Sequence, residues 1–262
     1  MPHILIIESD TPNLIAHRHA SGRRPDGERY ADVLREIDAT VSSTICAPYA
    51  GEIPDFTTAD GVVFTGSAVA WSVAEEPARP LRDAMEQAFA AGLPVYGSCN
   101  GMQVGAVVLG GEIGACELGC EDGLARDIHL TGAGRTHPML AGRRDGYTAI
   151  CVHRDEVSRP PTDATVLSGN RHTNIQTFAY EKNGVRFWGS QYHPEYAPQF
   201  MAWYLPNVAA RPNEQLQADL QILENDAQAA TRHNTSLHEM APNGRYTELR
   251  NWLISLNPES GT

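Results

Sequence analysis

The chain has 262 residues, of which 42% are hydrophobic and 20% charged, and its formal net charge is -12 at pH 7. This composition is typical of a globular protein. The acidic balance argues against a general nucleic-acid binder, which needs a basic surface. No apolar run reaches about 18 residues, so no transmembrane helix is expected. The N-terminus lacks the basic start and cleavage site of a secretory signal, and we expect a cytoplasmic protein.

The cysteines also restrict the class of protein. There are five, an odd number without a regular spacing, which argues against a disulfide scaffold. Cys116 and Cys120 are not accompanied by a second pair at zinc spacing. We therefore expect no metal site.

The N-terminal half alternates predicted strands and helices. Apolar runs predict strands at residues 4–7, 41–46, 61–65 and 94–97. Helices are expected between and after them, at residues 28–37, 80–91 and 100–109. The first helix carries Tyr30, Val33 and Leu34 at the spacing of one buried face. The polar segment 13–27 is interpreted as a loop. This alternation predicts an α/β fold whose mainly parallel central sheet is flanked by helices.

The C-terminal half has a different pattern. Short β-like runs occur at residues 124–130, 147–152, 165–167, 175–180 and 185–189. They predict antiparallel structure that either completes the sheet or forms a small second one. A helix is expected at 197–204, and helices again at 214–230 and 249–256. We predict a main domain over residues 1–206 and a C-terminal helical extension over 207–262, which packs on the main domain or, less favoured, forms a dimer or partner surface.

The segment around Cys99 has the form strand, Gly-x-Cys-x-Gly, helix. Gly97 and Gly101 allow a tight turn and a close approach of strand and helix, as in a nucleophile elbow. The turn places Cys99 at a helix N-terminus, which favours a thiolate. The N–H of Asn100 then points to where an oxyanion would form.

A second motif follows the last predicted strand. His193 and Glu195 flank Pro194, so a turn can present the carboxylate beside the imidazole. A thiol nucleophile needs such a base, and the base needs an orienting acceptor. The alternative is a capping or surface His-Pro-Glu, but its combination with the elbow favours a Cys99–His193–Glu195 triad.

The motifs GSCNGMQ and QYHPE together resemble the class I (triad) glutamine amidotransferase family, over roughly residues 3–205. The chain resembles members such as the amidotransferase domain of GMP synthetase. It implies a flavodoxin-like fold, with Cys99 as nucleophile, His193 as base and Glu195 as orienting acid. It also implies an oxyanion hole built from the N–H groups of Gly66 and Asn100.

The resemblance further implies substrate contacts. The residues expected to make them are Ser67, Gln103 and His153, together with Val152, Arg154 and Asp155 from the segment around His153. For His153 a structural turn residue is an equal alternative. Three departures from the family pattern, at Ser98, at Asn100 and in segment 67–71, concern the leaving group and leave the nucleophile intact. Trp71, the Arg-rich segment 18–24 and the acidic segment 8–10 could shape a pocket, but we expect ordinary surface or loop there.

The expected activity is hydrolysis of a γ-glutamyl amide, either glutamine or a γ-glutamyl amine or peptide, through a γ-glutamyl thioester on Cys99. The partner is then a small-molecule substrate, and no cofactor is needed. One alternative is a glutaminase subunit that delivers ammonia to a separate synthetase, and another is a catalytically silent binding module. A cysteine α/β-hydrolase is disfavoured because Glu195 follows His193 in the chain. Homo-oligomerisation is possible.

Overall fold

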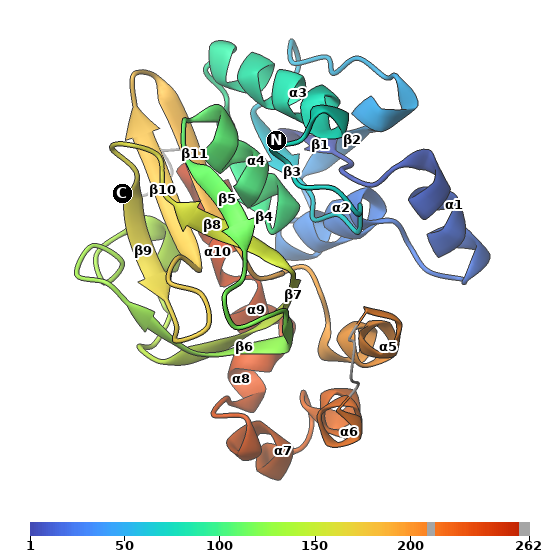
Figure 1. Ribbon diagram of the computed structural model, residues 1–262, viewed down its shortest axis with the longest axis vertical. Helices are drawn as coiled ribbons and strands as arrows, with labels where there is room; N and C mark the ends of the chain where they lie inside the picture. The colour runs from blue at the N-terminus through green and yellow to red at the C-terminus, as the bar shows by residue number, and fades with distance from the viewer. Residues whose placement is uncertain (209–212, 257–262) are drawn as a thin grey trace.

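The computed structural model describes residues 1–208 and 213–256, and its centre is a nine-stranded sheet (Figure 1). The strand order is β2-β1-β3-β4-β11-β10-β9-β6-β7. The strands from β2 to β11 in this order are parallel, and the neighbours from β11 to β7 are antiparallel. The strands are β1 His3–Ile7, β2 Ser42–Cys46, β3 Gly61–Phe64, β4 Pro94–Ser98, β6 Glu121–Leu130, β7 Tyr147–His153, β9 Thr165–Gly169, β10 Thr177–Lys182 and β11 Val185–Ser190.

A separate two-stranded antiparallel sheet pairs β5 (Glu112–Ala115) with β8 (Asp155–Arg159). Both sequence-based alternatives for the C-terminal half are therefore present. The antiparallel strands complete the main sheet, and a small second sheet exists as well. The strands that form it, β5 and β8, were not among the predicted runs, because they are short and lack an alternating apolar pattern.

Helices surround the main sheet. They are α1 Pro12–Ala20, α2 Asp26–Ile37, α3 Arg79–Ala90, α4 Asn100–Val108, α5 Pro198–Val208, α6 Glu214–Ile222, α7 Ala227–Arg232, α8 Leu237–Met240, α9 Pro242–Arg245 and α10 Thr247–Ser255. Short 3-10 turns lie at Pro48–Ala50, Glu76–Ala78 and Pro138–Leu140. None of the helices in the described residues is long and apolar enough to traverse a bilayer.

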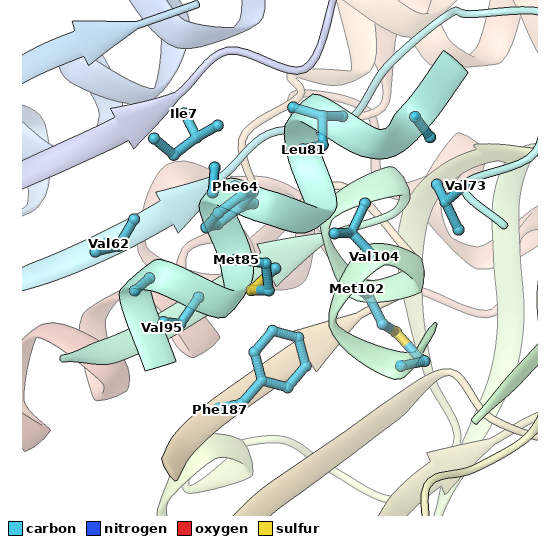
Figure 2. Close-up of a cluster of buried hydrophobic side chains, with 14 of the residues drawn as sticks. Ile7, Val62, Phe64, Val73, Leu81, Met85, Val95, Met102, Val104 and Phe187 are labelled. Carbon is cyan, nitrogen blue, oxygen red and sulfur yellow. The ribbon is translucent and has the colours of Figure 1, made fainter. Parts of the chain in front are cut away.

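Alternating residues of the central strands pack into two hydrophobic cores, one on each face of the sheet. On one face, Ile7, Phe64 and Val95 meet side chains of α3 and α4, such as Met85 and Met102 (Figure 2). On the other face, Ile4, Ile6 and Tyr96 pack with α2 and α10. This two-sided burial is typical of parallel strands between helix layers, and it confirms the predicted α/β fold.

The C-terminal helix α10 is part of this second core. Trp252 is 1% exposed, and a Cβ placed on Gly61 would lie 3.0 Å from its ring. The expected packing of the last helix on the main domain is thus confirmed. Helices α5, α6 and α7 form another cluster, against Leu124 and Ile150 of the antiparallel half. The boundary at residue 206 and homo-oligomerisation stay predictions.

The prediction of a loop over 13–27 was wrong. Helix α1 begins at Pro12, after Thr11, whose Oγ1 accepts the N–H of Leu14 at 3.4 Å. The periodicity signal was missing because the side chain that α1 buries is Arg18 and not an apolar stripe.

The single helix expected over 214–230 was also wrong in extent. It is divided into α6 and α7, because Asp226 starts a new helix by accepting the N–H of Ala229 at 2.7 Å. Its predicted apolar face is confirmed, since Leu216, Leu220 and Leu223 are buried.

Candidate active site

Cys99 lies in the sharp turn between β4 and α4. Its backbone has φ 48° and ψ -106°, a conformation that L residues rarely adopt. A Cβ on Gly97 would lie 2.5 Å from the carbonyl carbon of Gly101, and a Cβ on Gly101 would lie 2.4 Å from the oxygen of Phe64. Only glycine therefore fits on either side of the nucleophile candidate, and the predicted elbow is present.

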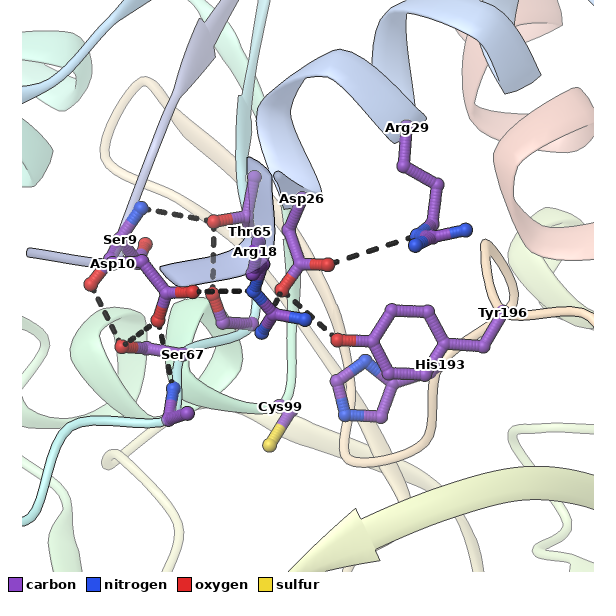
Figure 3. Close-up of polar contacts among 12 residues, drawn as sticks. Ser9, Asp10, Arg18, Asp26, Arg29, Thr65, Ser67, Cys99, His193 and Tyr196 are labelled. Carbon is purple, nitrogen blue, oxygen red and sulfur yellow. Dashed lines mark hydrogen bonds and ion pairs between the residues drawn. The ribbon is translucent and has the colours of Figure 1, made fainter. Parts of the chain in front are cut away.

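His193 comes to Cys99 from the neighbouring parallel strand. Strand β11 pairs with β4 in a register that sets Ser190 beside Ser98, and the chain after β11 turns over the elbow. The backbone N–H of His193 donates to the backbone oxygen of Ile150 at 2.8 Å, and the ring Nδ1 of His193 donates to Glu195 Oε1 at 2.7 Å. Its Nε2 is buried, is hydrogen-bonded to no described residue, and lies on the side of the ring facing Cys99 (Figure 3).

The charge balance at His193 favours its protonated form. Burial lowers the pKa of His193, but the charges of Glu195 and Cys99 outweigh it and raise the pKa to about 10. An imidazolium whose free N–H faces Cys99 stabilises negative charge on Sγ. The arrangement can hold a thiolate–imidazolium pair and later donate a proton.

Two further side chains, which sequence reasoning did not assign to the site, hold Glu195. Tyr30 donates its hydroxyl to Glu195 Oε2 at 3.0 Å and also lies 2.7 Å from Ser98 Oγ. Ser98 lies 3.4 Å from Glu195 Oε1. Tyr30 was recognised only as part of an apolar helix face, and Ser98 only as a departure from the family pattern.

Gly66 packs directly against the imidazole. A Cβ at this position would lie 2.6 Å from His193 Cε1, so no other residue fits without moving the ring. Within residues 1–208 and 213–256, the N–H groups of Gly66 and Asn100 have no hydrogen-bond acceptor. Free N–H groups beside a nucleophile are what an oxyanion hole requires.

A cavity of about 250 Å³ opens in front of Cys99. Eight of the ten predicted site residues line it, and Gly66 and Glu195 lie behind them. The other lining residues are Ala68, Val69, Trp71, Cys120, Asp122, Val152, Tyr196 and Tyr204. The structure thus brings the predicted site together around one small-molecule-sized space.

A protein-family model described as "Glutamine amidotransferase class-I" matches residues 31–206, which is more than half of the chain. The chain belongs to this family. The site just described lies mostly within the matched region.

Individual relatives agree with this assignment. The chain is 36% identical to a γ-glutamyl-L-1-hydroxyisopropylamide hydrolase of Pseudomonas sp. over 153 residues, which are 57% of this chain and 52% of the relative. It is 32% identical to the glutamine-hydrolysing GMP synthase of Edwardsiella ictaluri over 178 residues, 64% of this chain and 32% of the relative. The matches therefore span about half or less of these relatives' length.

A solved structure shares the fold over nearly the whole chain. A glutamine amidotransferase from Thermotoga maritima superposes with a TM-score of 0.65 at 19% identity, covering 97% of both chains. The amidotransferase family fold therefore accounts for the C-terminal helices as well as for the sheet.

In this amidotransferase family member, the side chains predicted to contact substrate form hydrogen bonds with other residues at the cavity wall. Gln103 Nε2 donates to the Asp155 oxygen at 2.7 Å, and Arg154 donates to the Ala70 oxygen at 2.9 Å and pairs with the Asp155 carboxylate at 3.0 Å. Ser67 Oγ donates to the Ser9 oxygen at 2.8 Å. These bonds fix the shape of the cavity, and substrate contact by these residues stays a prediction.

His153 lies in the cavity wall and belongs to a second buried group. Its Nε2 donates to Glu121 Oε2 at 3.0 Å, and its Nδ1 lies 3.3 Å from Cys116 Sγ. Glu121, Cys151 and His153 have the donor types of a metal site and lie close together. However, Cys151 Sγ–H already donates to the Glu121 oxygen at 3.4 Å, and both ring nitrogens of His153 have protein partners. The group is complete as a hydrogen-bonded structure.

The segments expected to be ordinary surface are instead buried beside the cavity. Glu8 and Asp10 are at most 2% exposed, and Arg18 is 5% exposed. That expectation was wrong for these residues. Asp10 pairs with Arg18, and the Glu8 carboxylate accepts the backbone N–H groups of Gly27 at 2.7 Å and Asp10 at 3.0 Å, so these groups have partners away from water. Trp71 lines the cavity and donates its Nε1–H to the Tyr49 hydroxyl at 3.1 Å.

Proposed function

We propose that this protein hydrolyses a γ-glutamyl amide through a γ-glutamyl thioester on Cys99. The observation that carries the proposal is the imidazole of His193: Nδ1 is held by Glu195, and Nε2 is free toward Cys99 on the elbow. Membership of the class I family and the name of the Pseudomonas relative support a γ-glutamyl substrate.

The chemistry follows from the geometry. The Cys99 thiolate attacks the δ-carbonyl, and the Gly66 and Asn100 N–H groups hold the oxyanion, each lowering the barrier by about 3 kcal/mol. His193 then donates its Nε2 proton to the departing nitrogen, which leaves as ammonia or an amine. The neutral His193 takes a proton from water, whose oxygen attacks the thioester. Glutamate leaves, and the free thiolate and imidazolium are restored.

The cavity leaves room for an amide larger than glutamine itself. Asn100 lines the cavity, and its buried Oδ1 has no partner among the described residues. The amide nitrogen of the substrate, in glutamine or in a substituted amide, offers an N–H donor to that oxygen. The aromatic walls Trp71 and Tyr204 leave room for the substituent.

The second candidate function is a glutaminase subunit that supplies ammonia to a synthetase. The matched GMP synthases support it, because the chain matches only about a third or less of their length. In that case the isolated chain should turn over slowly and be stimulated by a partner. A silent binding module on the same fold is the third.

The deciding experiment compares the isolated protein on glutamine and on a series of γ-glutamyl alkylamides, with glutamate release as the readout. We expect substituted amides to be cleaved at least as fast as glutamine, without any partner. Reaction with a glutamine-like chloroketone, with the labelled peptide identified by mass spectrometry, should modify Cys99. Failure of Cys99 to be labelled and of every amide to be cleaved would leave the silent module. Slow cleavage of glutamine alone would favour the synthetase subunit.

A further inference from the structure

A buried charge cluster centred on Arg18 lies beside the triad (Figure 3). Arg18 Nε donates to Asp10 Oδ2 at 2.9 Å, and its Nη2 donates to Asp26 Oδ2 at 3.1 Å. Both carboxylates are fully buried. Such ion pairs add little stability compared with apolar packing, so a cluster of this kind beside a reaction site calls for another role.

One arm of the cluster reaches the loop that carries the oxyanion donor. Asp10 Oδ1 accepts the N–H of Ala68 at 2.8 Å and lies 3.0 Å from the hydroxyl oxygen of Ser67. These residues directly follow Gly66. The position of the Gly66 N–H is thus tied to Asp10, which Arg18 holds.

The other arm reaches the catalytic imidazole. Tyr196 donates its hydroxyl to Asp26 Oδ2 at 2.9 Å. Its ring stacks on His193 with 4.2 Å between centroids and 4° between planes. A parallel stack at this distance restricts the tilt of the imidazole and therefore the direction of Nε2 toward Cys99.

We propose that Arg18 and Tyr196 are positioning residues, which through Asp10 and Asp26 hold the oxyanion loop and the His193 ring in register with each other. The inference rests on the proposed function, since it assigns the two arms to one reaction. The family match begins at residue 31, so Asp10, Arg18 and Asp26 lie outside it. Helix α1 therefore contributes Arg18, which supports a site built mostly from the matched region.

The first test is Tyr196→Phe, which keeps the stacked ring and removes only the hydrogen bond to Asp26. The matched control is Tyr246→Phe, which removes a similar 3.0 Å bond to Glu36 away from the site. We expect kcat for the cleaved amide to fall about 10- to 100-fold in Tyr196→Phe with KM changed less than about twofold, because misplaced reacting groups slow chemistry more than binding. The control should keep the wild-type kcat.

A second readout needs no substrate. Alkylation of Cys99 by iodoacetamide, followed on the Cys99 peptide by mass spectrometry across pH, reports the thiolate. A tilted imidazole holds the thiolate less well, so the Tyr196→Phe profile should move to higher pH. The titratable and charged groups facing His193 are Cys99, Glu195 and Tyr196, with Arg29 beyond the Tyr196 ring and Tyr30 beyond Glu195.

Arg18→Lys tests the residue that links Asp10 to Asp26. Lysine keeps the charge but lacks the fork that reaches both carboxylates. Arg245→Lys is its control, because Arg245 is also a buried arginine paired with a carboxylate, Glu224 at 2.6 Å. We expect Arg18→Lys to lower kcat and move the alkylation profile in the same direction as Tyr196→Phe.

Two outcomes would overturn the proposal. One is an unchanged kcat and alkylation profile in both Tyr196→Phe and Arg18→Lys, relative to their controls. The other is a rise in KM alone, which would make these residues part of substrate binding. If the wild type cleaves no γ-glutamyl amide but the alkylation profile still moves, the positioning role stands and the proposed function fails.

Discussion

The molecule contains two buried groups of cysteine, histidine and glutamate beside one cavity. They differ in whether the second ring nitrogen of the histidine has a protein partner. At the end of β11, His193 uses Nδ1 for Glu195 and leaves Nε2 free toward Cys99. At the end of β7, His153 uses Nε2 for Glu121, while its Nδ1 lies beside Cys116. The residue types are the same, so composition alone does not separate a reaction site from a structural one.

Electrostatics separates the two groups further. Burial and the nearby carboxylates Glu156 and Glu121 raise the pKa of Cys116 to about 12, which keeps it a thiol beside the His153 ring. At the other group, the charges of Glu195 and Cys99 outweigh burial and hold the pKa of His193 near 10. A thiol–imidazole hydrogen bond is inert, whereas an imidazolium facing a cysteine supports a nucleophile.

The largest expected difference is between the two cysteines. Cys99→Ala should lower kcat at least about 10⁴-fold, as loss of the nucleophile does in other triads. Cys116→Ala, the matched control, should stay within about tenfold of wild type because its thiol does not face the cavity chemistry. The measurement is glutamate release from the preferred amide. Comparable losses of kcat in both variants would contradict the assignment of Cys99 alone as the nucleophile.

The two glutamates should differ next. Glu195→Gln removes the charge that orients and protonates His193, and kcat should fall about 10²- to 10⁴-fold, as when a triad acid becomes an amide. Glu121→Gln should reduce kcat less than about tenfold, since Glu121 lies behind the cavity wall. Initial rates at saturating substrate measure both. A larger loss in Glu121→Gln would mean that the second group acts in the reaction.

His153→Gln tests the structural role directly. Removing a buried imidazole with partners on both nitrogens should lower the free energy of unfolding by about 1–3 kcal/mol. The same variant should keep kcat within a few-fold if His153 only shapes the wall. Denaturant unfolding and steady-state kinetics on one preparation measure the two quantities. Normal stability with lost activity would instead place His153 in substrate contact.

The smallest effect is an acid-side change in stability. Burial alone would raise the pKa of Glu121, but its hydrogen bond and charge interaction with His153 outweigh burial and lower it. A lowered folded-state pKa stabilises the fold above the unfolded value of 4.5, and this contribution is lost as pH falls below it. The unfolding free energy of Glu121→Gln should therefore fall less steeply below pH 4.5, by less than about 1.4 kcal/mol per pH unit. Parallel wild-type and variant curves would contradict this assignment.

The features predicted well from sequence are those whose physics is local. The elbow depends on Gly97 and Gly101, which are within two residues of Cys99, and the sheet depends on apolar runs. His193 and Glu195 are two residues apart, so their pairing was also readable.

The features that were missed depend on distant partners. Arg18 and Asp10 looked like surface charges, because only the fold brings Asp26 and the oxyanion loop to them. Tyr30 occupies an apolar helix position, and nothing in its sequence context shows that its hydroxyl meets Glu195. Charge burial and side-chain reach across the sheet are tertiary properties, and a single sequence carries no local signal for them.

The packing of Trp252 on Gly61 has a consequence for synthesis of the chain. The two residues are 191 positions apart, and Trp252 completes the core around Tyr96 beside the elbow strand. Helix α2 covers part of this face early, but during translation the part that α10 covers stays exposed until almost the whole described chain has left the ribosome. The core beside the candidate site is thus completed only late, and chains that stall before α10 leave apolar side chains around Tyr96 exposed.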